Sequence, residues 1–199
     1  MVNDSMKTTD TKARILRCAL EQFNKLGTRS VTTNHIAKAC DMSPGNLYYH
    51  FKNKEQIIAA IFEKMIADWD EDVVDMQTLA LHEILDSQLE KTFQYVWNYR
   101  FIHRELASLL DRDRKLKLRC HEVLQRRLME AKALVVGFEQ GGFLKPLEEE
   151  DRQFIAHTAL YYGLFWQPYL EVVGEKASKK NVLQGVNMIR LLFKPYLSS

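Results

Sequence analysis

Nearly every apolar residue from Asp10 onward recurs at a spacing of three or four positions, and no run alternates apolar and polar residues long enough to form a strand. This periodicity restricts the chain to helical folds, because a sheet with one buried face requires a side-chain repeat of two. With 199 residues, of which 46% are hydrophobic, the chain can pack its helices around a core. The sequence therefore predicts an all-α protein, with a small basic N-terminal unit and a larger helical body.

Local signals divide the first 70 residues into four helices. Leu26-Gly27 predicts the end of the first helix, and Thr32-Thr33 predicts the N-cap of the second. Ser43-Pro44 opens the third helix, since Ser caps it and Pro at its first position loses no hydrogen bond. The fourth helix begins with a capping box at 53–56. Residues 31–52 therefore form two short helices joined by a four-residue turn.

Apolar spacing beyond an acidic stretch at 68–75 predicts five further helices, over residues 78–98, 100–111, 113–140, 149–173 and 179–195. The longest uncharged run, 153–170, contains polar residues and lacks flanking basic asymmetry, so it indicates a buried helix rather than a membrane span. The polar N-terminus does not have the pattern of a secretory signal. We expect a soluble, cytoplasmic protein that does not contact the membrane.

The second of the two short helices, 43–51, carries side chains suited to reading nucleic acid. Leu47 and Phe51 lie one turn apart and share the face that packs on the preceding helix. Asn46 and its polar neighbours project elsewhere, and asparagine can pair bidentately with adenine in the major groove. The first 56 residues hold nine Lys/Arg against five Asp/Glu, an excess that favours a polyanionic partner. The alternative is a generic helical hairpin with two surface tyrosines.

A set of positions between 10 and 58 resembles, in order and spacing, the N-terminal DNA-binding domain of the tetracycline-repressor (TetR) family of bacterial regulators. These positions are Arg14, Ile15, Leu16, Ala19, Phe23, Gly27, Thr32, Thr33, Ile36, Ala37, Ser43, Gly45, Leu47, Tyr48, Phe51, Lys54 and Glu55. Asp41 stands where the family usually has glycine, but aspartate tolerates the left-handed backbone that the turn needs. The rest of the chain is similar to the family only in length and helicity.

The resemblance implies a homodimeric all-α repressor that binds a palindromic double-stranded DNA operator and leaves it when a small ligand enters the C-terminal domain. It implies three parts: a flexible N-terminal arm at 1–9, a three-helix helix-turn-helix DNA-binding domain at 10–56, and a helical effector-binding and dimerisation domain at 57–199. The last two helices are expected to form a four-helix bundle with those of the partner. Such a bacterial protein would lie on the nucleoid when bound to DNA.

Family roles carry over position by position onto the two short helices. The resemblance implies that Thr33 holds a phosphate, with Asn34 beside it as a base contact, and that the next helix lies in the major groove. Within the helix that opens with Ser43 and Pro44, the residues expected to reach base edges are Gly45, Asn46 and Tyr49. The residues expected to grip phosphates are Tyr48, His50 and Lys54.

Two groups of aromatic residues in the body, at 93–101 and 154–169, suggest a cavity for an apolar or aromatic effector. The predicted lining of this pocket is Phe93, Trp97, Phe101, Thr158, Tyr161, Tyr162, Phe165 and Trp166. The same residues also fit a packed core or a dimer interface, because aromatic enrichment is typical of interfaces as well.

Other kinds of chemistry find little support in the sequence. The acidic cluster at 68–75 lacks the ligand order of a calcium loop, and the three cysteines have no CxxC spacing, so we expect no metal and no cofactor. Nothing local to the cysteines activates them as a redox switch. His82-Glu83 and His121-Glu122 lack the second histidine of a zinc-protease helix, and neither a nucleophile elbow nor a phosphate loop occurs. We therefore expect no catalytic residues.

Two other functions stay open on the sequence alone. One is an effector-independent activator or architectural DNA-binding protein. The other is a helical ligand-binding protein whose N-terminal domain no longer binds DNA.

Overall fold

The computed structural model describes residues 2–71, 91–92, 94–175 and 178–198. Within these ranges the regular elements are all helices, and one isolated bridge pairs Leu144 with Leu197. The elements are α1 (Val2–Leu26), α2 (Thr33–Ala39), α3 (Pro44–His50), α4 (Lys54–Glu71), α6 (Arg100–Arg112), α7 (Arg114–Gln140), α8 (Glu149–Val172), α9 (Lys179–Phe193) and the short 3-10 helix η1 (Lys194–Tyr196). The all-α prediction is confirmed, and most of the helix expected at 78–98 lies outside the described residues.

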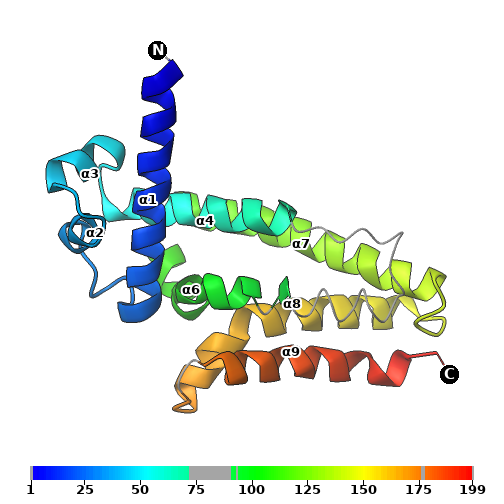
Figure 1. Cartoon of the computed structure of the whole chain (residues 1–199). Helices are drawn as coiled ribbons and strands as arrows, with labels where there is room; N and C mark the ends of the chain where they lie inside the picture. Colours follow the sequence, from blue (N-terminus) through cyan, green and yellow to red (C-terminus); the bar gives the residue numbers. More distant parts are fainter. Residues whose placement is uncertain (1, 72–90, 93, 176–177, 199) are drawn as a thin grey trace.

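Helices α1 to α3 form the head of the molecule, with α2 and α3 on the side of α1 that faces away from the body (Figure 1). As predicted, α1 ends at Leu26, where Gly27 adopts a φ of +79° that reverses the chain. Helix α1 begins at Val2, within the segment 1–9 that was expected as an N-terminal arm, and the flexibility of that arm stays a prediction. This segment contains no glycine or proline that would stop a helix.

Two hydrophobic clusters form the core. The first contains residues of helices α1 through α4, of α6 and of the first half of α7, and it includes Phe23 and Phe101. The second joins the other half of α7 to α8 and α9, and it includes Phe138 and Ile155. The first cluster has members on both sides of the expected domain boundary at 56/57. The boundary itself stays a prediction.

A polar contact joins the end of α1 to α6, and we call it the α1–α6 latch: Asn24, Thr28, Arg104 and Glu105. The Glu105 carboxylate accepts hydrogen bonds from the Thr28 backbone N–H (3.1 Å) and the Thr28 hydroxyl (2.5 Å). The Asn24 side chain bonds two backbone groups near the start of α6. Arg104 also reaches α8, where its Nε lies 3.5 Å from a Glu171 carboxylate oxygen. The latch therefore connects the head to both α6 and α8.

Helices α8 and α9 run antiparallel along the body (Figure 1). Within α8, Pro168 lacks the N–H that would continue the helix hydrogen bonds, and the helix bends in its last third. Close packing with α9 depends on Gly185, because a Cβ at this position would overlap the Trp166 indole. The Trp166 N–H donates to the Asn181 carbonyl at 2.7 Å. None of the described helices is long and apolar enough to cross a membrane.

Candidate nucleic-acid interface

The turn between α2 and α3 sets the direction in which α3 leaves the head. Asp41 adopts a φ of +52°, the left-handed conformation expected for it. Ser43 caps α3 as predicted, since its Oγ accepts a hydrogen bond from the Asn46 backbone N–H at 3.2 Å. Leu47 is fully buried and holds α3 against the core. One face of α3 is thereby fixed, and the opposite face is left at the surface.

The outer face of α3 is polar and strongly exposed. Asn46 lies on it, Tyr48 is 47% exposed, and Tyr49 is 80% exposed. A Cβ at Gly45 would meet only the Ser43 Oγ, at 4.0 Å. Glycine therefore leaves the backbone open at the start of α3, where another molecule can approach it closely.

Helices α2 and α3 are joined at this surface by a hydrogen bond between side chains. The Thr33 hydroxyl lies 2.9 Å from the Tyr48 hydroxyl. Both residues were predicted to bind phosphate, one from each helix, and the structure brings their hydroxyls together. A paired set of hydroxyls can donate one proton to an anion while the other is shared between the two oxygens.

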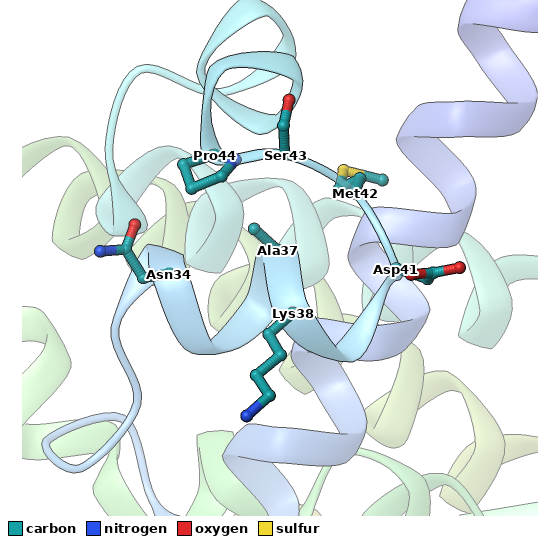
Figure 2. A pocket seen from close by; sticks show the side chains of 7 residues that line it. All are labelled: Asn34, Ala37, Lys38, Asp41, Met42, Ser43 and Pro44. Atoms are coloured by element: carbon teal, nitrogen blue, oxygen red, sulfur yellow. The ribbon is translucent and has the colours of Figure 1, made fainter.

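An open hollow of about 440 Å³ lies beside the turn (Figure 2). Its lining includes the predicted residues Asn34, Ser43 and Pro44, together with Ala37, Lys38, Asp41 and Met42. Lys38 is exposed one helical turn after Asn34 on α2. The sequence analysis did not select Lys38, although its four-residue spacing from Asn34 was a usable signal.

His50 and Lys54 were predicted to bind phosphate, and these roles stay predictions; each side chain also has close neighbours in the head. Burial and the nearby charge of Lys12 lower the pKa of His50 below its ordinary value of 6.5. At pH 7 the ring is neutral, so it offers a phosphate one N–H donor and no charge. The Lys54 ammonium points inward and donates to the backbone carbonyls of Thr28 (2.6 Å) and Val31 (3.0 Å). Lys54 thus holds the loop that leads into α2.

Family models match both parts of the chain. One, described as bacterial regulatory proteins of the tetR family, matches residues 15–61. The other, described as a bacterial transcriptional repressor, matches residues 71–199. The chain belongs to the TetR family of bacterial transcriptional regulators. As a TetR-family member it is a DNA-binding regulator and not an enzyme, and its family is one of ligand-responsive proteins.

Individual relatives support the same assignment. A TetR-family regulator from Marinobacter aquaeolei superposes with a TM-score of 0.82 at 34% identity, covering 94% of this chain and 91% of that one. The regulator UidR of Escherichia coli is 45% identical over 60 residues, which is 29% of this chain and 31% of UidR, so the match spans less than a third of that relative's length. AibR, crystallised with isovaleryl coenzyme A and operator DNA, shares the fold alone, with a TM-score of 0.64 at 21% identity and with 89% of this chain and 97% of AibR covered.

The aromatic residues predicted to line one effector pocket occupy three environments in this TetR-family chain. Phe101 is fully buried in the first core cluster, with its ring 5.2 Å from that of Phe23 in the head. The Trp97 ring lies under the Arg100 guanidinium at 4.6 Å. Tyr161 and Phe165 are 55% and 58% exposed on the outer side of α8.

The other predicted lining residues lie on the partly buried side of α8. Tyr162 stacks on Trp166 with ring centroids 6.2 Å apart, and Thr158 is partly buried. Phe93 lies outside the described residues. The structure places the described residues of this set in separate environments, and their role as one effector pocket stays a prediction. Helical spacing tells which side chains share a face but not what that face meets.

Two buried polar side chains in the body lack hydrogen-bond partners among the residues that the structure describes. They are His103 on α6, through both of its ring nitrogens, and Gln167 on α8, through both polar atoms of its side chain. Burial lowers the pKa of His103 to about 4, so the ring is neutral. A buried polar group without a partner is costly unless water or a ligand satisfies it. Sequence analysis did not select His103, which looks like any other helical histidine.

Proposed function

We propose that this TetR-family chain is a homodimeric repressor, which binds a near-palindromic operator through α3 and releases it when a small apolar or aromatic effector enters the body. The observation that carries the proposal is the outer face of α3. Asn46 and Tyr49 are exposed there beside the open backbone at Gly45, while Leu47 anchors the helix. An asparagine presented in this way suits the edge of an adenine in the major groove.

The dimer part of the proposal is supported by an apolar stripe on α8. Its members recur at helical spacing and are all more than half exposed: Phe154, Tyr161, Phe165, Tyr169 and Val172. Exposed apolar residues also lie on the adjacent α9, at Leu183, Met188 and Leu191. A contiguous apolar face of this kind marks an interaction site, and a second copy presents the same face. Two recognition helices would then stand roughly 34–36 Å apart, one turn of DNA.

The effector part is supported by the unpartnered polar atoms of His103 and Gln167, since a polar group on a bound ligand would give either side chain a hydrogen-bond partner. Contacts from α4 offer a route to the head. Asp68 accepts a hydrogen bond from Tyr99, next to α6, and Asp70 binds Arg127 on α7 at 2.7 Å. An effector that prefers one arrangement of these helices would change the position of the head. The resulting coupling between effector binding and operator binding is typically about 1–3 kcal/mol.

Selection of bound DNA from a pool of random duplexes tests the operator part. The purified full chain is used at roughly 150 mM salt, because lower salt favours binding that ignores sequence. We expect enrichment of a near-palindrome whose half-sites are centred about one helical turn apart. Weak, salt-sensitive binding without any enriched sequence would contradict the proposal.

A separate experiment tests the effector part. A panel of small aromatic and apolar compounds is screened for those that raise the thermal unfolding midpoint of the protein. Compounds that do so should lower affinity for the selected operator by about one to two decades. If they stabilise the protein and leave operator affinity unchanged, the chain is an effector-independent DNA-binding protein.

A further inference from the structure

Two cysteines face each other where α1 meets the end of α2. The Cys18 thiol on α1 donates to the Ala39 carbonyl at 3.7 Å, beside Cys40 in the chain. The Cys40 thiol donates to the Arg14 carbonyl at 3.9 Å, one helical turn before Cys18. Each sulfur therefore points at the backbone that carries the other cysteine. This reciprocal arrangement places both thiols in one small volume of the head.

The surroundings of the two thiols distinguish their roles. Cys18 is partly exposed and can be reached by a small solute, whereas Cys40 is only 5% exposed. Burial, and then a hydrogen bond and the charge of Cys18, raise the pKa of Cys40 to about 12, while Arg14 and Arg17 act in the opposite direction. Cys18 is thus the residue that an oxidant meets first, and Cys40 is the thiol held against it.

We propose that Cys18 and Cys40 are a dithiol that peroxides oxidise to a reversible disulfide within the head, and that this bond weakens operator binding. The site is a place of covalent modification in the DNA-binding head, separate from the effector response. Its effect on DNA rests on the proposed function, whereas formation of the disulfide does not.

The chemistry balances with a peroxide as the oxidant. With hydrogen peroxide, the Cys18 thiol first loses its proton and the thiolate sulfur attacks one peroxide oxygen, so that an S–O bond forms and the O–O bond breaks. The other oxygen leaves as hydroxide and takes up the released proton to become water. The sulfur of Cys40 then attacks the sulfenic sulfur of Cys18. The S–S bond forms as the S–O bond breaks, and the hydroxide leaves as a second water with the proton of Cys40.

Oxidation at Cys18 also removes one of the lesser causes that raise the pKa of Cys40, while burial, the largest cause, remains. A sulfenic acid carries no thiolate charge, so the Cys18 charge that raises the pKa of Cys40 disappears, while Arg14 and Arg17 still favour the Cys40 thiolate. A dithiol outside an oxidising compartment suits sensing rather than permanent cross-linking, because cellular thiols reduce it again.

The new bond would act on α3 through the turn. Cys40 is the C-cap of α2 and directly precedes Asp41, and α3 begins at Pro44. A disulfide brings two sulfurs from contact distance to about 2.05 Å, which pulls the end of α2 toward α1. The start of α3 follows, and its base-reading face moves away from its position in the groove.

The first experiment measures thiols in the reduced full-length protein after treatment with hydrogen peroxide and alkylation. We expect loss of two thiols per chain and a non-reduced digest in which the Cys18 and Cys40 peptides are linked. Cys120→Ser should behave like the wild type, because Cys120 is buried and lies on α7, not on the helices that carry Cys18 and Cys40. Cys18→Ser should leave Cys40 as a free thiol, and circular dichroism verifies that both variants fold.

Several results would overturn the proposal. One is oxidation of Cys18 to a sulfinic acid while Cys40 remains a free thiol. Another is a disulfide that joins two chains or involves Cys120. The third is thiol loss in Cys18→Ser equal to that of the wild type. The wild-type digest decides the pairing without any variant.

The second experiment measures affinity for the selected operator before and after oxidation. We expect about a tenfold loss, comparable to the loss of one base contact, with recovery after reduction and no change in Cys18→Ser. A disulfide that forms without changing operator affinity would overturn the regulatory part. If selection finds no operator, the proposed function fails while the digest still decides whether the disulfide exists.

Discussion

Asn46 is the residue on which sequence discrimination is expected to depend most. We predict that Asn46→Ala lowers affinity for the selected operator by about 1–3 kcal/mol and relaxes base preference at one position of each half-site. Competition titrations with operator and scrambled duplexes measure both effects. Gln140→Ala is the control, since it removes an exposed amide at the far end of α7. Equal losses on operator and scrambled DNA would mean that Asn46 contacts the backbone instead.

Lys54 is expected to act on stability before it acts on DNA. In Lys54→Met the carbonyls of Thr28 and Val31 lose their donor, so the free energy of unfolding should fall by about 1–3 kcal/mol. Urea denaturation measures the change, and Lys52→Met, at an exposed lysine nearby, should leave stability unaltered. Suppose instead that Lys54→Met leaves stability unchanged and lowers the slope of DNA affinity against salt concentration by about one unit. Lys54 would then be a phosphate contact, as the sequence predicted.

These residues also show what a sequence can predict of such an interface. Ser43 and Asp41 were correctly predicted in their roles because caps and left-handed turns depend on a few neighbouring residues. The inward turn of Lys54 was not predictable in this way, since its two acceptors belong to a loop more than 20 residues earlier. The pairing of Thr33 with Tyr48 likewise depends on how two helices pack.

At the level of helices, the contact between α8 and α9 depends on a glycine. We predict that Gly185→Ala destabilises the protein by about 1–3 kcal/mol, because its methyl group would overlap the Trp166 indole. Gly163→Ala on α8 is the matched control, since nothing lies within 4 Å of its Cβ position, and it should stabilise by about 0.5–1 kcal/mol. Thermal unfolding of both variants gives the comparison. Similar effects of the two substitutions would contradict the close α8–α9 approach.

The junction of α7 and α8 should respond to acid through Glu139. Hydrogen bonds from Arg152 and from the Leu147 backbone N–H lower the pKa of Glu139 to about 2, from an ordinary value near 4.5. Because the folded state favours the carboxylate, its contribution to stability is full above pH 4.5 and is lost as the pH falls toward 2. Urea midpoints should therefore show Glu139→Gln less stable than the wild type at pH 6, with the gap closing in acid. A gap that is constant with pH would exclude this role.

Helix positions were predictable and helix neighbours were not. The end of α1 at Gly27 and the start of α3 at Pro44 follow from signals within a few residues. Phe101 and Phe165 looked alike in sequence, each one turn from another aromatic residue. The first is fully buried against the head and the second is 58% exposed, because that difference depends on tertiary packing.

For the whole molecule, dimerisation through α8 is the property most open to test. We predict that Phe165→Asp turns the dimer into a monomer and weakens operator binding, because each head then binds a half-site alone. Sedimentation velocity and operator titration measure the two effects. Leu118→Asp is the matched control, since Leu118 is also 58% exposed but lies on α7. A Phe165→Asp protein that remains dimeric would place the interface on another surface.

The α1–α6 latch also has a consequence for the order in which the molecule is made. Glu105 lies 77 residues after Thr28, so at bacterial rates of synthesis it leaves the ribosome roughly 4–15 s later. During that interval the end of α1 lacks the acceptor that its N–H and hydroxyl use in the finished protein. The loop that leads into α2 is thus among the first segments to be synthesised, but its hydrogen bonds to α6 form only after residue 105 has been made.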